Sequence, residues 1–241
     1  MDLDMRNKTY LVMAASRGLG RAAADAVRSE GGRVLTTSRT PGETFVLDTG
    51  DRSSRELFLH AVAGERLSGL FVNTGGPKGG GVLALSDEDW EVAFAQILLG
   101  PIHLVRGLLP QMERGGSVLI NASSSVAQPI PQLALSNVLR AGLHALVKTL
   151  VDELAPHGIR INLIVPGRID TDRVRDLDRA VAARTSTDED AVRRASQARI
   201  PLQRYGEPAE FGRLAAFLLS PLSSYLNGAA YWVDGGQNRG L

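Results

Sequence analysis

The 241-residue sequence contains no cysteine, which excludes disulfide bonds, thiolate metal sites and a cysteine nucleophile. It also lacks an excess of charge of one sign, because 27 basic and 26 acidic residues leave a formal net charge of +1. This balance gives no reason to expect a nucleic-acid partner. The absence of cysteine fits a reducing compartment, so we expect a cytoplasmic protein.

The sequence also lacks long apolar segments. No stretch approaches the roughly 20 apolar residues that cross a bilayer, so we expect no membrane partner. The N-terminus, Met1 to Asp4, is acidic and leads into a strand-like run, which predicts no signal peptide. A chain of this length with 44% hydrophobic residues suits one α/β domain over residues 1–241, and no change in composition marks a second.

Short apolar runs alternate with longer segments of helical periodicity, a pattern typical of β-α-β units and a parallel sheet. The runs are apolar on both faces, as strands covered by helices on both sides must be. The predicted strands are residues 9–14, 33–37, 44–47, 69–73, 117–121, 160–164 and 230–233. The predicted helices are residues 20–30, 52–63, 87–111, 132–155 and 208–219.

One connection is unusually short. Only residues 38–43, with Pro41 and Gly42 among them, separate the second predicted strand from the third. Parallel strands normally need about a dozen or more residues for a crossover. We therefore predict that the crossover helix between these strands is missing and that one face of the sheet is thinly covered there.

A glycine turn joins the first predicted strand to the first predicted helix. At such a turn, free N–H groups and the helix dipole favour a bound pyrophosphate. Two glycines alone also fit a plain helix-entry turn. The pattern predicts a Rossmann-type, doubly wound parallel sheet of about seven strands. The residues expected to hold a dinucleotide in this loop are Ala14, Ser16, Arg17, Gly18, Leu19 and Gly20.

The end of the second predicted strand favours NADP over NAD. NAD-binding domains usually carry an acidic residue there for the ribose 2′-hydroxyl, whereas an arginine accommodates a 2′-phosphate. Ser38 and Arg39 occupy this position, and Arg17 lies close by in the expected geometry. The alternative is that both arginines are ordinary solvated surface residues.

Three further residues are expected along the cofactor edge. Asp48, just past the third predicted strand, can accept a hydrogen bond from an adenine amino group, or cap the next helix. Asn73 and Gly75 follow the fourth strand, at the sheet edge where ligands of such folds bind.

In order and spacing, these motifs resemble the short-chain dehydrogenase/reductase family, most closely its 3-oxoacyl-ACP reductase-like members, over essentially the whole chain. The family's glycine-rich entry corresponds to residues 13–20, and its Asn-Asn-Ala-Gly motif to residues 73–76. Its Pro-Gly motif matches Pro166 and Gly167. The resemblance implies NADP(H) as cofactor, with Ile169 and Thr171 near the nicotinamide carboxamide, and no metal.

The resemblance also implies a catalytic serine, a tyrosine 13 residues later and a lysine four residues beyond it. Without gaps these positions fall on Ser123, Ser136 and Arg140, so the serine is kept while the tyrosine and the lysine are replaced. A gapped alignment moves the serine role to Ser124 or Ser125.

The replacements change the chemistry available at the site. A tyrosine phenol can be tuned from a pKa near 10 toward 7, but a serine hydroxyl is far too weak an acid. Arg140 can bind a ribose hydroxyl but cannot donate its proton, and Ile97, where the family has a relay asparagine, cannot carry one. Of the tyrosines, only Tyr205 lies on an element that can fold over the nicotinamide. General acid catalysis contributes about 10²–10⁴-fold, so slow hydride transfer is expected to remain.

Two functions compete on this basis. The first is an NADP(H)-dependent oxidoreductase that interconverts a carbonyl and a secondary alcohol, with a small-molecule carbonyl or acyl-carrier substrate. The second is a catalytically weak NADP(H)-binding sensor or the silent partner of an active subunit.

Residues 172–201, where arginines and acids interleave, take the place of the family's substrate-covering helices. The mixture of charges is typical of a mobile, solvated helical pair. Excess apolar positions on the helices at 87–111 and 132–155 predict a homodimer or homotetramer.

Overall fold

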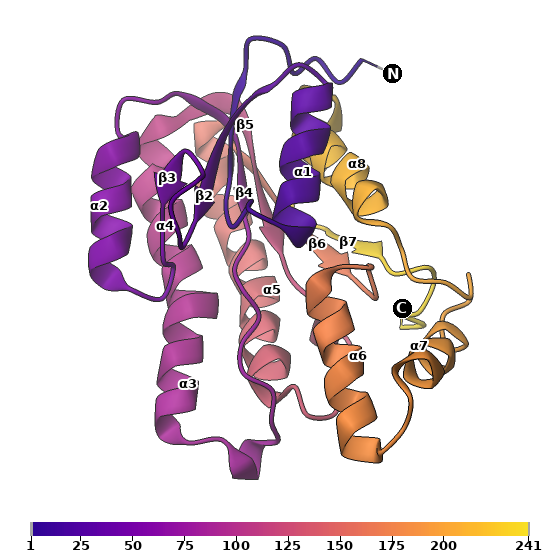
Figure 1. Ribbon diagram of the computed structural model, residues 1–241. Coiled ribbons are helices and arrows are strands. Elements are labelled where there is room, and N and C mark those ends of the chain that lie inside the picture. Colours follow the sequence, from indigo (N-terminus) through magenta and orange to yellow (C-terminus); the bar gives the residue numbers. More distant parts are fainter. Residues whose placement is uncertain (1, 241) are drawn as a thin grey trace.

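A parallel sheet of seven strands, in the order β3-β2-β1-β4-β5-β6-β7, runs through the computed structural model, which describes residues 2–240 (Figure 1). Each pair of neighbouring strands is parallel. The order reverses between β1 and β4, the place where doubly wound sheets bind their ligands. The predicted sheet is therefore confirmed. The strands are β1 (Thr9–Val12), β2 (Arg33–Ser38), β3 (Phe45–Val46), β4 (Leu67–Val72), β5 (Met112–Asn121), β6 (Arg160–Pro166) and β7 (Ala230–Val233).

Helices cover both faces because successive side chains of each strand point to opposite sides. On β1, Tyr10 and Val12 enter the core that contains Phe211, while Leu11 enters the core that contains Phe58. The first core lies under α1 (Gly18–Ser29) and α8 (Pro208–Leu219). The second lies under α2 (Arg52–Val62), α4 (Gly100–Leu108) and α5 (Ala134–Leu154).

The crossover helix between β2 and β3 is absent, as predicted, since residues 39–44 form bends only. Two threonines hold this short connection together. The backbone N–H of Thr36 donates to Thr44 Oγ1 at 3.1 Å, and the N–H of Thr44 donates to Thr36 Oγ1 at 3.3 Å. Gly42 turns the chain with a φ of 127°, which favours glycine. Val46 on β3 is 51% exposed, as expected where no helix covers the sheet.

The helix predicted over 87–111 is interrupted. It consists of α3 (Asp87–Phe94), a π-helical turn (Ala95–Leu99) and α4, followed by a short 3₁₀ turn. The turn precedes Gly100, where an added Cβ would lie 2.3 Å from the carbonyl oxygen of Thr49. It also precedes Pro101, which has no N–H to continue the helical ladder. Close packing and the proline together account for the irregularity.

The same run bears on the expectation that no segment spans a membrane. Asp87–Gln111 is long and apolar enough to cross a bilayer by length and composition, with a mean hydropathy of 1.6 in its most apolar window, although no such stretch was expected. Core helices of proteins outside membranes can have the same length and apolar composition. Here Ile97, Leu104 and Leu108 are fully buried in the core beneath the sheet.

The polar segment forms two helices, α6 (Asp172–Thr185) and α7 (Glu189–Gln197), which lie beyond the carboxyl ends of the strands (Figure 1). Its acids and arginines pair with each other and with the loop after β6. Asp170 in that loop accepts hydrogen bonds from Arg175 at 3.1 Å and from Arg193 at 2.7 Å. The interleaved charges thus hold α6 and α7 against the sheet edge.

Candidate functional site

The glycine loop is tied to β2 at its start. The N–H groups of Ala14 and Ala15 donate to Thr37, at 3.2 Å to its hydroxyl and 2.9 Å to its carbonyl. Ala14 has a φ of +50°, in the region that favours glycine, and this is where the family has its first glycine. The helix starts at Gly18, two residues earlier than expected. Arg17 precedes it without a side-chain cap, so the first N–H groups of α1 stay free for a ligand.

Gly20 allows α1 to pack against the strand ends. An added Cβ would lie 2.2 Å from the carbonyl oxygen of Ala14 and 3.0 Å from Asn73 Nδ2, so no larger residue fits. The Cβ position of Gly18 is 3.8 Å from Thr171 Cγ2. The loop therefore lies between the ends of β4 and β6, with Ser16 exposed at its tip and Leu19 half-buried.

At the end of β2, Ser38 is buried and its hydroxyl hydrogen-bonds the carbonyl oxygen of Thr40. Arg39, the next residue, is exposed and makes no ion pair among the described residues. Its guanidinium is thus free to meet a phosphate, while the hydroxyl of Ser38 stabilises the turn that carries it.

Asp48 does not cap the following helix, which corrects one of its two expected roles. Asp51 caps α2, accepting from the N–H of Ser54 at 2.8 Å. Asp48 Oδ1 instead accepts from the N–H of Gly50 at 2.9 Å. The half-buried carboxylate keeps its second oxygen without a hydrogen bond in the described structure, in line with the adenine role.

The ends of β4 and β5 are joined by two asparagines. Asn121 Nδ2 donates to Asn73 Oδ1 at 2.9 Å, and both residues are buried. Asn121 Oδ1 and Thr74 Oγ1 are buried without a hydrogen-bond partner among the described residues. Gly75 is exposed beside them. Buried polar atoms normally have partners, so this edge fits a polar ligand such as a dinucleotide.

The loop after β6 closes the other side of the site. Gly167 follows Pro166 and donates from its N–H to the carbonyl of Val233 at 2.9 Å. Ile169 is buried and forms a bridge with Gly206. Thr171 is the N-cap of α6, without a side-chain cap, and its hydroxyl donates to the carbonyl of Ile169 at 3.4 Å.

Three serines meet at the end of β5. Ser123 Oγ accepts from the N–H of Ser125 at 3.3 Å, which leaves the hydroxyl hydrogen of Ser123 available. Ser125 Oγ lies 3.3 Å from Ser136 Oγ, and both residues are buried. Ser125 thus faces Ser136 in the interior, whereas Ser123 and Ser124 are half-buried.

Arg140 lies under this serine turn. Its Nη1 donates to the carbonyl oxygens of Asn121 at 3.0 Å and Ala122 at 3.1 Å, the residues just before Ser123. Burial, reinforced by the charge of Arg173, lowers the pKa of Arg140 to about 10. No carboxylate pairs with it in the described part of the chain.

Arg173, which the sequence did not single out, lies against the loop after β4. Its Nη2 donates to the carbonyl of Pro77 at 3.0 Å, from the first turn of α6 across to the loop after β4. The only signal in the sequence was its position two residues after Thr171.

Tyr205 is not available as a replacement acid. Its hydroxyl donates to Asp178 Oδ2 at 2.9 Å, and the ring is buried beneath the guanidinium of Arg193, 4.5 Å from its centroid. Burial raises the pKa of Tyr205 above its ordinary value. It is a structural link between α6 and the residues before α8.

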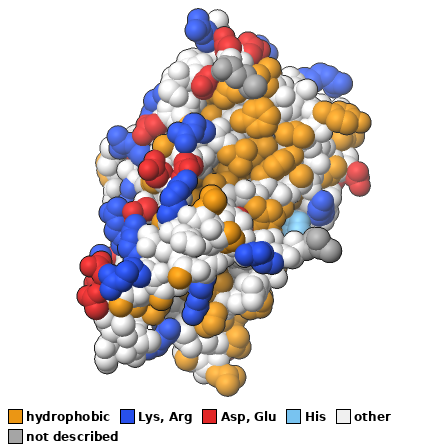
Figure 2. Space-filling model, turned by 90° about the vertical axis from the view of Figure 1, so that its right-hand side faces the viewer, with side chains coloured by type: hydrophobic (Ala, Val, Ile, Leu, Met, Phe, Trp, Pro, Cys, Tyr) orange, Lys and Arg blue, Asp and Glu red, His pale blue; other side chains and the backbone are white. Residues whose placement is uncertain are grey.

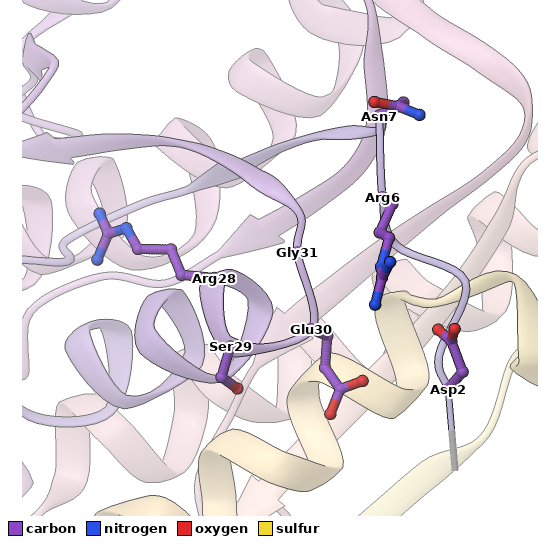
Figure 3. Close-up of a pocket in the computed structure, with 7 residues that line it drawn as sticks. All are labelled: Asp2, Arg6, Asn7, Arg28, Ser29, Glu30 and Gly31. Carbon is purple, nitrogen blue, oxygen red and sulfur yellow. The ribbon is translucent and has the colours of Figure 1, made fainter.

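Two surface cavities lie outside this constellation. One, of about 710 Å³, lies between the N-terminal segment and the turn after α1, and Figure 3 shows Arg6, Arg28 and Glu30 around it. It is at the amino-terminal edge of the sheet, opposite the glycine loop. The other, of about 310 Å³, is lined by Gly76, Pro77 and Gln96 and adjoins the cofactor edge.

A glycine turn, a free arginine after β2 and a serine turn at the carboxyl edge of a doubly wound sheet define a dinucleotide-dependent oxidoreductase fold. The chain belongs to the short-chain dehydrogenase/reductase family. A sequence model of the family described as Enoyl-(Acyl carrier protein) reductase matches residues 13–238.

Individual relatives match over nearly the whole chain. Protein FixR from Bradyrhizobium diazoefficiens is 32% identical, over 96% of this chain and 87% of its own length. The 3-oxoacyl-[acyl-carrier-protein] reductase FabG from Vibrio cholerae is 26% identical, over 97% and 98%. L-sorbose reductase from Gluconobacter frateurii, solved with NADPH and L-sorbose, superposes with a TM-score of 0.92 at 25% identity, over 100% of both chains.

Proposed function

We propose that the chain is an NADP(H)-dependent oxidoreductase that interconverts a carbonyl and a secondary alcohol with an atypical active site. The observation that carries this proposal is Ser123, whose hydroxyl hydrogen is free at the carboxyl edge of the sheet. Arg140 supports the turn from below, through the carbonyls of Asn121 and Ala122. The domain spans residues 1–241, and residues 172–201 cover the substrate.

The residues present fit NADP(H). The free N–H groups at the start of α1 suit a diphosphate, and Arg39 with Arg17 suits the 2′-phosphate. We assign Ile169 and Thr171 to the nicotinamide carboxamide. When bound, the cofactor supplies or accepts the hydride. The NADPH in the L-sorbose reductase structure supports this assignment.

The chain's own residues then act on the carbonyl oxygen. Ser123 polarises it with a hydrogen bond. Arg140 holds a ribose hydroxyl with the guanidinium N–H groups that do not donate to the carbonyls of Asn121 and Ala122. Ser136 is tied to Ser125 and is a very weak acid, so we assign the proton to a water molecule at the Ser123 hydroxyl. Positioning thus replaces acid catalysis, which predicts slow turnover. By analogy with FabG, the substrate is a small carbonyl compound or an acyl-carrier thioester.

A second candidate is a cofactor-binding sensor or the silent partner of an active subunit. The fully buried Ile97 favours it, because this apolar side chain stands where the family relays a proton. The Ser125–Ser136 pair favours it too, since both hydroxyls turn toward each other inside the protein.

NADPH oxidation by the purified chain distinguishes the two candidates. The assay uses a broad panel of ketones, 3-oxoacyl thioesters and quinones. Turnover of any of them supports the oxidoreductase. NADPH binding with no turnover across the panel overturns it in favour of the sensor or silent partner.

We also propose that the protein is a cytoplasmic homodimer or homotetramer. Phe94 at the end of α3, Leu99 in the π-helical turn and Val138 on α5 are 44%, 41% and 55% exposed, more than a monomer's surface would favour. Figure 2 shows hydrophobic side chains gathered on a second face, on the side of the molecule that carries α8.

A further inference from the structure

Arg173 joins two segments at the carboxyl edge of the sheet. One is the start of α6 at Thr171, and the other is the loop after β4, at Gly76 and Pro77. Arg173 Nη2 donates to the carbonyl of Pro77 at 3.0 Å. A Cβ on Gly76 would lie 2.8 Å from Arg173 Nε and 2.9 Å from Nη2. Glycine at position 76 therefore leaves the space that the guanidinium fills.

Arg173 differs from its neighbours on α6 in its partners. Arg175 pairs with Asp170 at 3.1 Å, and Arg179 pairs with Asp176 at 3.0 Å. Arg173 makes no ion pair within residues 2–240, although acids surround it in sequence. Its guanidinium contacts the loop after β4 instead of the aspartates of its own helix.

Arg173 and Arg140 share no carboxylate partner: within residues 2–240 neither guanidinium forms an ion pair. Arg140 is buried, and the charge of Arg173 acts on it, so the two guanidiniums repel each other. The starts of α1 and α6 approach each other at Gly18 and Thr171, and neither is capped by a side chain. Two like charges and two helix N-termini together favour an anion that carries more than one charge.

We propose that Arg173 binds the diphosphate of the dinucleotide and thereby closes α6 over it. The inference rests on the proposed function, because it takes NADP(H) as the ligand. A guanidinium has five N–H donors in a planar fork. One of them is used by Pro77, and the others are free for phosphate oxygens. The diphosphate charge also offsets the repulsion between Arg173 and Arg140, so the same side chain binds the cofactor and fastens α6 to the β4 loop.

The test compares Arg173→Gln with Arg175→Gln in the full chain. Both variants remove one positive charge from the exposed side of α6, and thermal unfolding shows that each is folded. The Kd for NADPH is measured by fluorescence titration. We expect Arg173→Gln to weaken NADPH binding about tenfold, the effect of one charged hydrogen bond, and Arg175→Gln to leave it unchanged. The difference should shrink at high salt, which screens the charges.

A second ligand separates this inference from the proposed function. Adenosine 2′-phosphate lacks the diphosphate, so Arg173→Gln should leave its affinity unchanged, whereas Arg39→Gln should weaken both ligands. If Arg173→Gln binds NADPH as tightly as the wild type or more tightly, Arg173 only connects α6 to the loop after β4, and the inference is overturned. A wild-type chain that binds no NADPH overturns the proposed function itself.

Discussion

The hydroxyl oxygen of Ser136 lies 3.3 Å from that of Ser125, in the interior below the serine turn. In the ungapped alignment proposed above, Ser136 corresponds to the family's tyrosine. On that proposal, two small weak acids stand in place of one larger phenol. The consequence for catalysis can be measured by introducing the tyrosine and the lysine.

The double variant Ser136→Tyr with Arg140→Lys should raise turnover by about 10²-fold, at the low end of what a general acid contributes. The rate of NADPH oxidation measures the effect on any substrate that the wild type accepts. The single variant Ser136→Tyr is the control, since its tyrosine lacks a lysine beside it. A wild type that already turns over as fast as the double variant would remove the basis of the silent-partner alternative.

Arg140→Lys alone should make stability depend on pH. Burial lowers the pKa of Arg140 to about 10, and the same burial lowers the pKa of a lysine at this position below its ordinary value of about 10.4. Between the folded and the unfolded pKa of that lysine, the unfolded chain binds more protons than the folded one, so the stability of the variant rises with pH. Below the folded pKa, the full cost of burying the charge is present.

The free energy of unfolding of the variant should rise between pH 7 and pH 9, relative to that of the wild type. Denaturant midpoints at both pH values measure it. Parallel stability profiles for the two proteins would show that the residue at position 140 is not buried in its charged form.

Tyr205→Phe should destabilise the protein without reducing turnover. The change removes the hydrogen bond to Asp178, which costs about 1.5 kcal/mol for a charged acceptor and lowers Tm by roughly 3–6 °C. Tyr225→Phe is the matched control, because Tyr225 is 99% exposed. A loss of turnover in Tyr205→Phe at a temperature where the fold is intact would identify Tyr205 as the proton donor after all.

Gly20→Ala should lower stability by about 1–3 kcal/mol, because its methyl group overlaps the carbonyl of Ala14. NADPH binding should weaken with it, since the start of α1 must move. Gly64→Ala is the control: a Cβ there meets nothing within 4 Å, and its φ lies outside the glycine-favouring range. Equal Kd values for NADPH in the two variants would show that the glycine loop does not hold the cofactor.

Leu99→Glu combined with Val138→Glu should convert the proposed oligomer to a monomer. The residues lie on adjacent elements and are exposed, so the charges disrupt association without entering the core. Light scattering after size-exclusion chromatography at micromolar concentration measures the mass. Leu202→Glu, at a 63% exposed position elsewhere, is the control. A monomeric wild type would contradict the prediction directly.

The fold was accessible from the sequence because its signals are local. The run around Leu11 is apolar on both faces and Gly18 marks the entry to α1, so β1, the turn and the helix could be predicted within a few residues. The missing helix after β2 followed from chain length alone. Asp51, rather than Asp48, caps α2, a choice that depends on the rotamer and the turn geometry.

The arrangement of the site depends on packing between distant segments, which no local pattern encodes. Arg173 meets Pro77 across 96 positions, and Ser125 meets Ser136 only because α5 packs under the serine turn. The π-helical turn before Gly100 follows from contact with Thr49. Sequence reasoning named the residue types at the site, but not which hydroxyls and guanidiniums face each other.

If Arg39 binds the 2′-phosphate as proposed, cofactor preference depends on the short connection between β2 and β3 that Thr36 and Thr44 hold together. Arg39 stands at its first position, and no helix lies behind it to transmit a change into the core. On the proposed role of Arg39, an exchange of residues 39–44 alters the preference for one dinucleotide over the other while the sheet stays as it is.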